Sequence, residues 1–210
     1  MPIHVGIHEP SQDRKRVKNT TLWVDADGKI GHRYQKLHLF DVDVPRGPVL
    51  KESGSVEPGP SIPMPFASPL GKVGSMICFD PRFPMLSSKL RDLGAEILTY
   101  PSAFTVPTGD AGHWHTLLTA RAIENQSYVI AAAQVGQHGA KRASYGHSLI
   151  VDPWGKVLGE GSGIDQWDEN NQEPTIICAE IDLNALERLR RDMPLKPRRD
   201  IVDVVQLGAN

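Results

Sequence analysis

The fold is decided by residues 72–84, which read KVGSMICFDPRFP. The first six of these residues are short and mostly apolar, which is typical of a buried strand. A helical pattern then runs over residues 83–93 and stops at Gly94, a residue suited to end a helix. A strand that turns into a helix is a basic unit of α/β domains, and Cys78 stands at this turn.

Strand-like and helix-like segments alternate along the rest of the chain, which predicts an α/β fold with one domain over residues 1–210. Residues 41–69 are rich in proline and predict a long loop, and residues 194–210 predict a C-terminal arm. We expect helices over 83–93, 113–125 and 183–191. We expect strands over 3–7, 20–24, 30–35, 72–77, 96–100, 128–134, 148–152, 156–158 and 175–181.

The chain begins on residues that read as the end of a strand. Residues 3–7 have this character, and no helical segment precedes them. Strands of a buried α/β sheet need cover on both faces. We therefore expect that part of the fold lies ahead of Met1.

Composition argues against several classes of protein. The net charge is −2 and the pI about 6.4, so no broad basic surface for nucleic acid is expected. No apolar run is long enough to cross a bilayer, and no secretory signal or transit peptide follows Met1. Two cysteines are too few for a secreted disulfide framework. We expect a cytoplasmic protein, with a mitochondrial form if an upstream segment exists.

Cys78 is the first candidate for chemistry. At a strand-to-helix turn, the positive end of the helix dipole and the nearby Arg82 would favour the nucleophilic thiolate. Free backbone N–H groups at the turn would hold an oxyanion. A small buried apolar residue fits the same position equally well. The second cysteine, Cys178, lies in an apolar segment and is expected in the core.

Two charged residues complete the set of candidates. Lys36 ends a predicted strand, and a buried lysine there would lower the pKa of a neighbouring thiol and stabilise an oxyanion. Glu52, in the predicted loop, would orient the lysine or position a water. Judged alone, each is better explained as a charge in solvent.

Two further patterns contain histidine, and neither predicts a catalytic or metal site. His113 and His115 flank Trp114 at a predicted helix start, but no carboxylate or cysteine accompanies them at ligand spacing. We expect a packing role there, and neither metal nor cofactor in the protein. His147 and Ser148 are neighbours on a predicted strand and point to opposite faces, so they do not form a catalytic dyad.

Several segments, taken in order, resemble motifs of the nitrilase superfamily of carbon–nitrogen hydrolases. They are YQKLHLFD at 34–41, ICFDPRFP at 77–84, GAEIL at 94–98, PSAF at 101–104, ARAIEN at 120–125, GHS at 146–148 and DPWG at 152–155. Together they cover nearly the whole chain. Residues 131–134 (AAAQ) and 142–147 (RASYGH) resemble the Nit branch, on the side of the deaminated glutathione amidases.

The resemblance implies a four-layer α-β-β-α sandwich of the nitrilase type, N-terminally truncated here and commonly paired into dimers. It implies Cys78 as nucleophile, Lys36 as its cationic partner and Glu52 as a second glutamate, with the Phe79 N–H as oxyanion donor. The family's general-base glutamate falls in an N-terminal segment absent from this chain, and Glu9 does not match it. The implied substrate is a small linear amide, either deaminated glutathione or the ω-amide of a keto acid.

The chain departs from the family pattern at Phe79, Pro81, Met85 and His115, with Gly112 as an apparent insertion. These changes are expected around the pocket. Two hypotheses therefore stay open. The first is a nitrilase-type amidase that works through a cysteine thioester and forms homodimers, with the apolar stretch 102–107 in the contact. The second is a truncated, inactive subunit or binding module, because the chain as given lacks the base.

Overall fold

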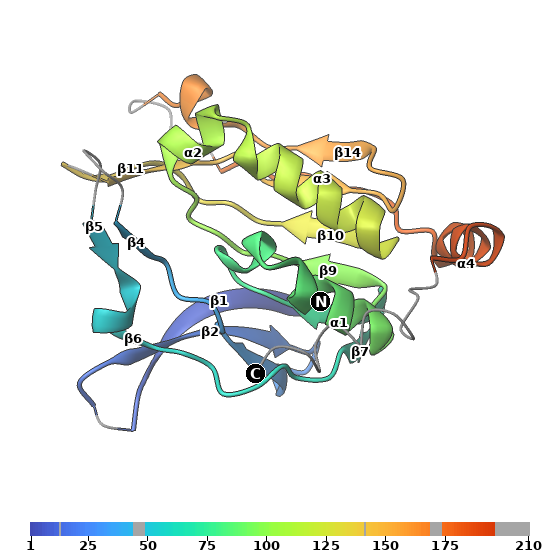
Figure 1. The fold of residues 1–210 in the computed structure, drawn as a ribbon, viewed down its shortest axis with the longest axis horizontal. Helices are drawn as coiled ribbons and strands as arrows, with labels where there is room; N and C mark the ends of the chain where they lie inside the picture. Colours follow the sequence, from blue (N-terminus) through green and yellow to red (C-terminus); the bar gives the residue numbers. More distant parts are fainter. Residues whose placement is uncertain (13, 44–48, 141, 169–173, 196–210) are drawn as a thin grey trace, which may run out of the picture.

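The structure, a computed structural model, describes residues 1–12, 14–43, 49–140, 142–168 and 174–195. Its larger sheet has six strands (Figure 1). In order across the sheet they are β14 (Val157–Glu160), β13 (Leu149–Val151), β10 (Tyr128–Ala131), β9 (Ile97–Thr99), β8 (Gly71–Ser75) and β7 (Phe66–Ser68). The three central strands β10, β9 and β8 are parallel. β13 pairs antiparallel with β10, β7 antiparallel with β8, and β14 antiparallel with β13.

The smaller sheet comes from the start of the chain. Strands β2 (Val17–Val24) and β3 (Ile30–Gln35), which contain the predicted strands 20–24 and 30–35, form a hairpin. β1 (Ile3–Pro10) is antiparallel to β2, and β6 (Val56–Glu57) is parallel to it. Hydrogen bonds within the turn stabilise the hairpin. Asp25 Oδ1 accepts the N–H groups of Asp27 and Lys29, at 3.0 and 2.9 Å. Gly28 supplies the left-handed backbone, φ +81°, that the turn requires.

Helices cover one face of the six-stranded sheet. These are α1 (Pro84–Asp92) and α3 (His113–Asn125), which lie over the strands in Figure 1. Proline at the first position suits the start of α1, and Gly94, φ +100°, follows its end. The core beneath them is apolar and includes Met76, Leu90, Leu98, Tyr100, Trp114, Leu118, Val129, Leu149 and Val151.

The smaller sheet packs on the other face of the larger one. His4 of β1 reaches Ser75 of β8 (Nε2 to Oγ, 3.2 Å), and the His32 ring stacks on Phe66 of β7 at 4.3 Å. Near this face, α4 (Leu183–Asp192) inserts Leu186 into a second apolar cluster. Helix, sheet and sheet thus form three layers of the expected sandwich within the described residues.

The predicted loop 41–69 contains more structure than expected. Among its described residues lie β4 (Asp41–Asp43), paired with β5 (Val49–Lys51), and the 3-10 turn η1 (Glu52–Gly54), besides β6 and β7. The remaining elements are α2 (Val106–Asp110), β11 (Val135–Gly139) with β12 (Arg142–Tyr145), and the 3-10 turns η2 (Asp80–Arg82) and η3 (Ile164–Gln166). Within the described ranges, no helix has the length and apolar character that a membrane span needs.

The predicted strand 175–181 is wrong. The segment forms no ladder, although burial alternates along it and Ile177 lies 3.6 Å from the position of a Cβ on Gly159 of β14. Cys178 faces outward on this segment and is exposed, so its assignment to the core is wrong as well. Most of the predicted arm, from residue 196 onward, lies outside the described residues.

Candidate active site

Cys78 stands on a sharp turn at the end of a buried strand. Beyond β8 the chain stays bonded to the neighbouring segment, since Met76 N donates to Thr99 O and Cys78 N to Pro101 O, at 2.9 and 3.1 Å. At Cys78 the backbone then enters the left-handed region, with φ +45°. Residues other than glycine adopt this conformation at a cost and are enriched at functional sites. The unusual backbone conformation therefore occurs at the residue that the sequence suggested as the nucleophile.

The turn leaves one backbone donor open. Phe79 N–H has no acceptor within the described part of the chain, whereas Asp80 N donates to Ile77 O and Arg82 N to Phe79 O. An unpaired N–H beside a candidate nucleophile is the arrangement of an oxyanion hole. The expected helix dipole contributes less than predicted, because η2 intervenes and α1 begins only at Pro84.

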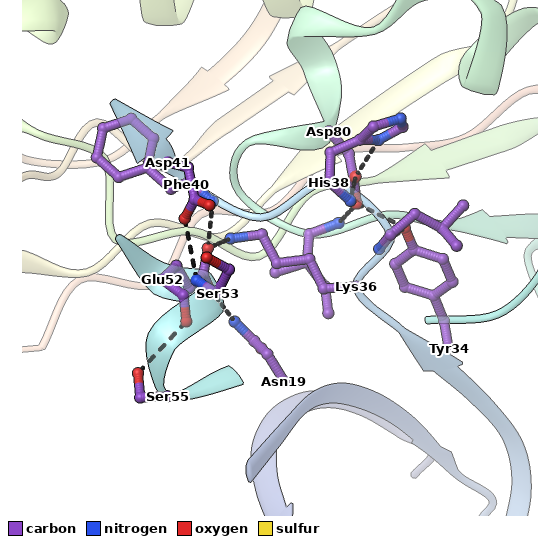
Figure 2. Close-up of polar contacts among 12 residues, drawn as sticks. Asn19, Tyr34, Lys36, His38, Phe40, Asp41, Glu52, Ser53, Ser55 and Asp80 are labelled. Atoms are coloured by element: carbon purple, nitrogen blue, oxygen red, sulfur yellow. Dashed lines mark hydrogen bonds and ion pairs between the residues drawn. The ribbon is translucent and has the colours of Figure 1, made fainter. Parts of the chain in front are cut away.

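Asp80 ties the cysteine turn to the lysine segment. Its side chain is fully buried, and Oδ2 accepts Tyr34 Oη at 2.6 Å and Ile77 N at 2.7 Å. Oδ1 receives His38 N at 3.3 Å and lies 2.8 Å from His38 Nδ1. Figure 2 shows Tyr34 and His38 converging on this carboxylate. Asp80 thus holds residues on both sides of Lys36 against the turn that carries Cys78.

Lys36 is buried and paired. Its side chain is 3% exposed, and Nζ donates to Glu52 Oε2 at 2.6 Å. Glu52 is held in turn by Phe40 N at 2.6 Å and Asn19 Nδ2 at 3.4 Å (Figure 2). The interpretation of Lys36 and Glu52 as solvated charges is therefore wrong, and the structure brings together two residues that lie far apart in the sequence.

The charge of Lys36 acts on Cys78, but it does not decide the state of the thiol. Cys78 keeps some exposed surface, yet burial raises its pKa above the ordinary value. Lys36 and the Ala103 N–H lower the pKa by less, and the Glu52 carboxylate raises it. The expected preference for thiolate is therefore wrong, because desolvation exceeds the attraction of a lysine already paired with a carboxylate.

Arg82 and several aromatic rings pack next to the turn that carries Cys78. The Arg82 guanidinium lies 5.7 Å from the centre of the Phe79 ring and 5.6 Å from that of Phe104. Burial lowers the pKa of Arg82, and a charge on Cys78, once the thiol is deprotonated, raises it. Phe79 also meets the Phe40 ring edge-on at 5.0 Å. A cavity of ≈ 290 Å³ is lined by Arg82 together with Leu37 and His38, the two residues that follow Lys36.

The other sequence candidates lie elsewhere. Glu9 sits in β1 and pairs with Arg33 at 2.6 Å, so it has no part in the Cys78 cluster. Trp114 is fully buried at the start of α3, but the packing role predicted for its two neighbours is wrong. His113 is exposed and His115 is half-buried, with Nε2 2.9 Å from Glu160 Oε1. Ser148 Oγ accepts the Ala133 N–H at 2.9 Å, as expected of a residue that forms no dyad with its neighbour.

The four departures from the family pattern do not gather in one place. Phe79 adjoins Cys78, and Pro81 gives its carbonyl to Arg121 Nε at 2.9 Å. Met85 is 71% exposed on α1 and lines the cavity of ≈ 290 Å³ together with Leu37 and His38. His115 joins a separate cluster with His147 and Glu160. The expectation that all of them surround the pocket is therefore wrong.

Asp80 is the residue of this site that sequence reasoning missed. The available signal was its place between a buried strand and a proline, where a carboxylate needs nearby N–H groups. Its partners Tyr34 and His38 lie more than 40 residues away. Such long-range pairing leaves no periodic trace in the sequence.

Residues 1–191 match the carbon–nitrogen hydrolase family. The chain is 48% identical to the probable hydrolase nit2 of Schizosaccharomyces pombe over 204 residues, which are 97% of this chain and 71% of that protein. It is 47% identical to human deaminated glutathione amidase over 197 residues, which are 92% of this chain and 57% of that enzyme. This chain thus spans little more than half the length of the human relative.

Solved structures agree with these matches. The Caenorhabditis elegans NitFhit protein superposes with a TM-score of 0.86 at 44% identity, over 96% of this chain and 47% of that one. Saccharomyces cerevisiae Nit3, a member of branch 10 of the nitrilase superfamily, gives a TM-score of 0.75 at 33% identity, over 92% of this chain and 64% of its own. The nitrilase-type α/β fold expected from the sequence is confirmed.

Proposed function

The chain belongs to the carbon–nitrogen hydrolase family, and we propose that it is an amidase whose nucleophile is Cys78. One observation carries the proposal. A cysteine in left-handed backbone is followed by an unpaired N–H, at Phe79, and lies within electrostatic reach of the buried pair of Lys36 and Glu52, whose charges shift its pKa. These are the parts that acyl transfer requires: a nucleophile, and donors for the oxyanion.

The first half of the reaction forms a thioester. Cys78 Sγ attacks the amide carbonyl carbon, and the carbonyl π electrons move onto oxygen. The Phe79 N–H and Lys36 Nζ hold that oxyanion, since an ammonium with three N–H donors can serve Glu52 and still donate elsewhere. When the carbonyl re-forms, the C–N bond breaks and the amine leaves with a proton. Water then attacks the thioester, releasing the carboxylic acid and the thiol.

The raised pKa of Cys78 makes proton transfer the demanding part of this cycle. A thiol must lose its proton before attack, and the leaving amine must gain one. Glu52 accepts three donors, and Glu9 pairs with Arg33, so neither stands free for that role. We therefore propose that Glu52 orients Lys36. We assign the role of general base to no residue of the described chain.

The substrate we propose is deaminated glutathione. The human relative is a deaminated glutathione amidase, and the probable hydrolase of S. pombe is at least as similar. Water would cleave the amide to give 2-oxoglutarate and cysteinylglycine. An ω-amide of a keto acid, which would release ammonia, is the runner-up.

A direct assay tests both points. The purified protein is incubated with deaminated glutathione or with a keto-acid ω-amide, and cysteinylglycine and ammonia are measured separately. We expect cysteinylglycine release that Cys78→Ala abolishes and Cys178→Ala leaves unchanged. Release of ammonia alone would replace the substrate, and turnover by Cys78→Ala would remove the nucleophile.

A second candidate function follows from the raised pKa of Cys78 and the unassigned base. In it the chain is a catalytically inactive subunit or binding module. The same assay separates the two functions, because an inactive subunit would bind the amide, as measured by calorimetry, without releasing either product.

For assembly we propose a homodimer, as the resemblance implies. The stretch 102–107 gives this less support than expected, because Ser102 and Phe104 are already buried within the chain. Sedimentation at micromolar concentration is the test, and a monomer there would contradict the proposal. For location we propose the cytoplasm, since Cys78 and Cys178 are both free thiols; fractionation of cells that produce the tagged protein would test this.

A further inference from the structure

Two histidines and a glutamate from three segments meet outside the Cys78 site. Glu160 Oε1, at the end of β14, lies 2.9 Å from His115 Nε2 of α3 and 2.7 Å from His147 Nδ1. His147 belongs to the short connection between β12 and β13. The three ligand atoms all fall within 4.8 Å of one another. The proposed reaction uses none of these residues.

A second carboxylate orients one of the rings. Asp165, in η3, places Oδ1 3.3 Å from His147 Nε2, the nitrogen opposite the one that faces Glu160. With its proton on Nε2, His147 donates to Asp165 and turns the Nδ1 lone pair toward the cluster. A carboxylate that holds the far nitrogen of a histidine in this way is the usual outer partner of a metal-bound imidazole.

The backbone around His147 is built to hold this orientation. His147 has a left-handed backbone, φ +56°, and its carbonyl accepts the Trp114 Nε1–H at 2.7 Å. A Cβ on Gly163 would lie 1.8 Å from His147 Nε2, so only glycine leaves room for the ring. Strained backbone, a fixed carbonyl and a required glycine all serve the position of one imidazole.

We propose that His115, His147 and Glu160 form a binding site for a divalent transition-metal ion of the zinc type. Imidazole nitrogen with carboxylate oxygen is a donor set that suits Zn²⁺, whereas Mg²⁺ and Ca²⁺ prefer oxygen donors alone. Around a tetrahedral Zn²⁺, neighbouring ligand atoms stand roughly 3.3 Å apart. The separations of 2.9 and 2.7 Å from Glu160 Oε1 to the two histidine nitrogens widen to that value with small side-chain rotations.

The cluster is accessible to an ion from solvent. His115 and Glu160 are about one-third exposed, at 34% and 38%, so an ion can enter and water can complete its coordination. The site joins α3, the 146–148 connection and β14, and so links the helical layer to the six-stranded sheet. A bound ion would fix them together, so we assign it a structural role.

The test is titration of the purified, metal-stripped protein with Zn²⁺ alone by calorimetry, with thermal unfolding measured in parallel. We expect one ion per chain and a higher Tm, because a ligand that binds only the folded state stabilises it. Mg²⁺ should produce neither effect. His147→Ala and His115→Ala should each weaken binding at least tenfold, while His138→Ala, which alters an exposed histidine of β11, should not.

Two further measurements keep the result decisive. Asp165→Asn retains the three ligands and should weaken binding by about 10- to 100-fold, the usual effect of an outer partner; it serves if an alanine variant fails to fold. Co²⁺ substituted for Zn²⁺ should show visible bands without a thiolate charge-transfer band. Equal Zn²⁺ affinity in the wild type and His147→Ala, or a thiolate band that places the ion on a cysteine, would overturn the site.

Discussion

At the residue scale, burial and charge oppose each other at Cys78. Burial raises the pKa of the thiol, Lys36 lowers it, and Glu52 raises it again. Lys36 and Glu52 form a close ion pair, so Lys36 lowers the pKa of the thiol less than an unpaired cation would. Cys78 is therefore a neutral thiol at rest, and it becomes reactive only when a base removes its proton.

Alkylation as a function of pH tests this state. With iodoacetamide, the exposed Cys178 should react before Cys78 at neutral pH, and the Cys78 rate should keep rising into the alkaline range. Lys36→Met should move the Cys78 inflection to higher pH, since it removes the stabilising charge, and Glu52→Gln should move it lower. Peptide mass spectrometry assigns each label. A Cys78 inflection below the ordinary cysteine value of about 8.5 would contradict the account.

The hydrogen bonds of Asp80 lead to a prediction about stability. Asp80→Asn keeps the shape but turns one acceptor into a donor that faces the Tyr34 hydroxyl or the Ile77 N–H. Loss of hydrogen bonds to a buried charge should lower the free energy of unfolding by about 1.5–3 kcal/mol, measured in urea. Asp27→Asn, in the exposed hairpin turn, is the matched control and should change it by less than about 0.5 kcal/mol. Equal stability of the two variants would remove Asp80 as the link between the motifs.

At the element scale, the two sheets meet through an acid-sensitive contact. The pKa of His4 in β1 is lowered to about 4, first by burial and then by the charge of His32. An unfolded chain, with the ordinary value of 6.5, binds more protons between pH 6.5 and 4. The stability that neutral His4 contributes is therefore present above pH 6.5 and is lost as the pH falls toward 4.

The size of this loss can be measured. At about 1.4 kcal/mol per pKa unit, a shift from 6.5 to about 4 gives a loss of at most about 3.5 kcal/mol. His4→Gln should flatten the fall of unfolding free energy between pH 6.5 and 4, whereas His8→Gln, exposed on the same strand, should keep it. Parallel curves for His4→Gln and the wild type would show that the contact between the sheets does not titrate.

Elements with local signals were predicted well from sequence. Helix α3 has the predicted bounds because Gly112 and Gln126, both left-handed, mark its ends. The hairpin of β2 and β3 follows from its Asp-Gly turn. Segment 175–181 failed because alternation reports an extended chain, while a ladder depends on a partner distant in sequence. Asp80 and the His115 cluster were missed for the same reason.

At the scale of the whole molecule, the proposed site belongs to both sheets. Lys36 directly follows β3 of the smaller sheet, and Cys78 follows β8 of the larger one. Glu52 comes from the segment between them, and Asp80 bonds the two sides. The motifs could be recognised in the sequence, but their meeting depends on the packing of one sheet on the other.

Acyl transfer to Cys78 tests the central claim most directly. An activated ester of a small acid needs no proton for its leaving group, so it should acylate the thiol even where amide turnover is slow. We predict a stoichiometric burst of the leaving group, with one acyl group located on Cys78 by peptide mass spectrometry after an acid quench. Cys78→Ala should abolish the burst, and Cys178→Ala should preserve it. An acyl group found on Cys178 and not on Cys78, or a burst that survives in Cys78→Ala, would contradict the account.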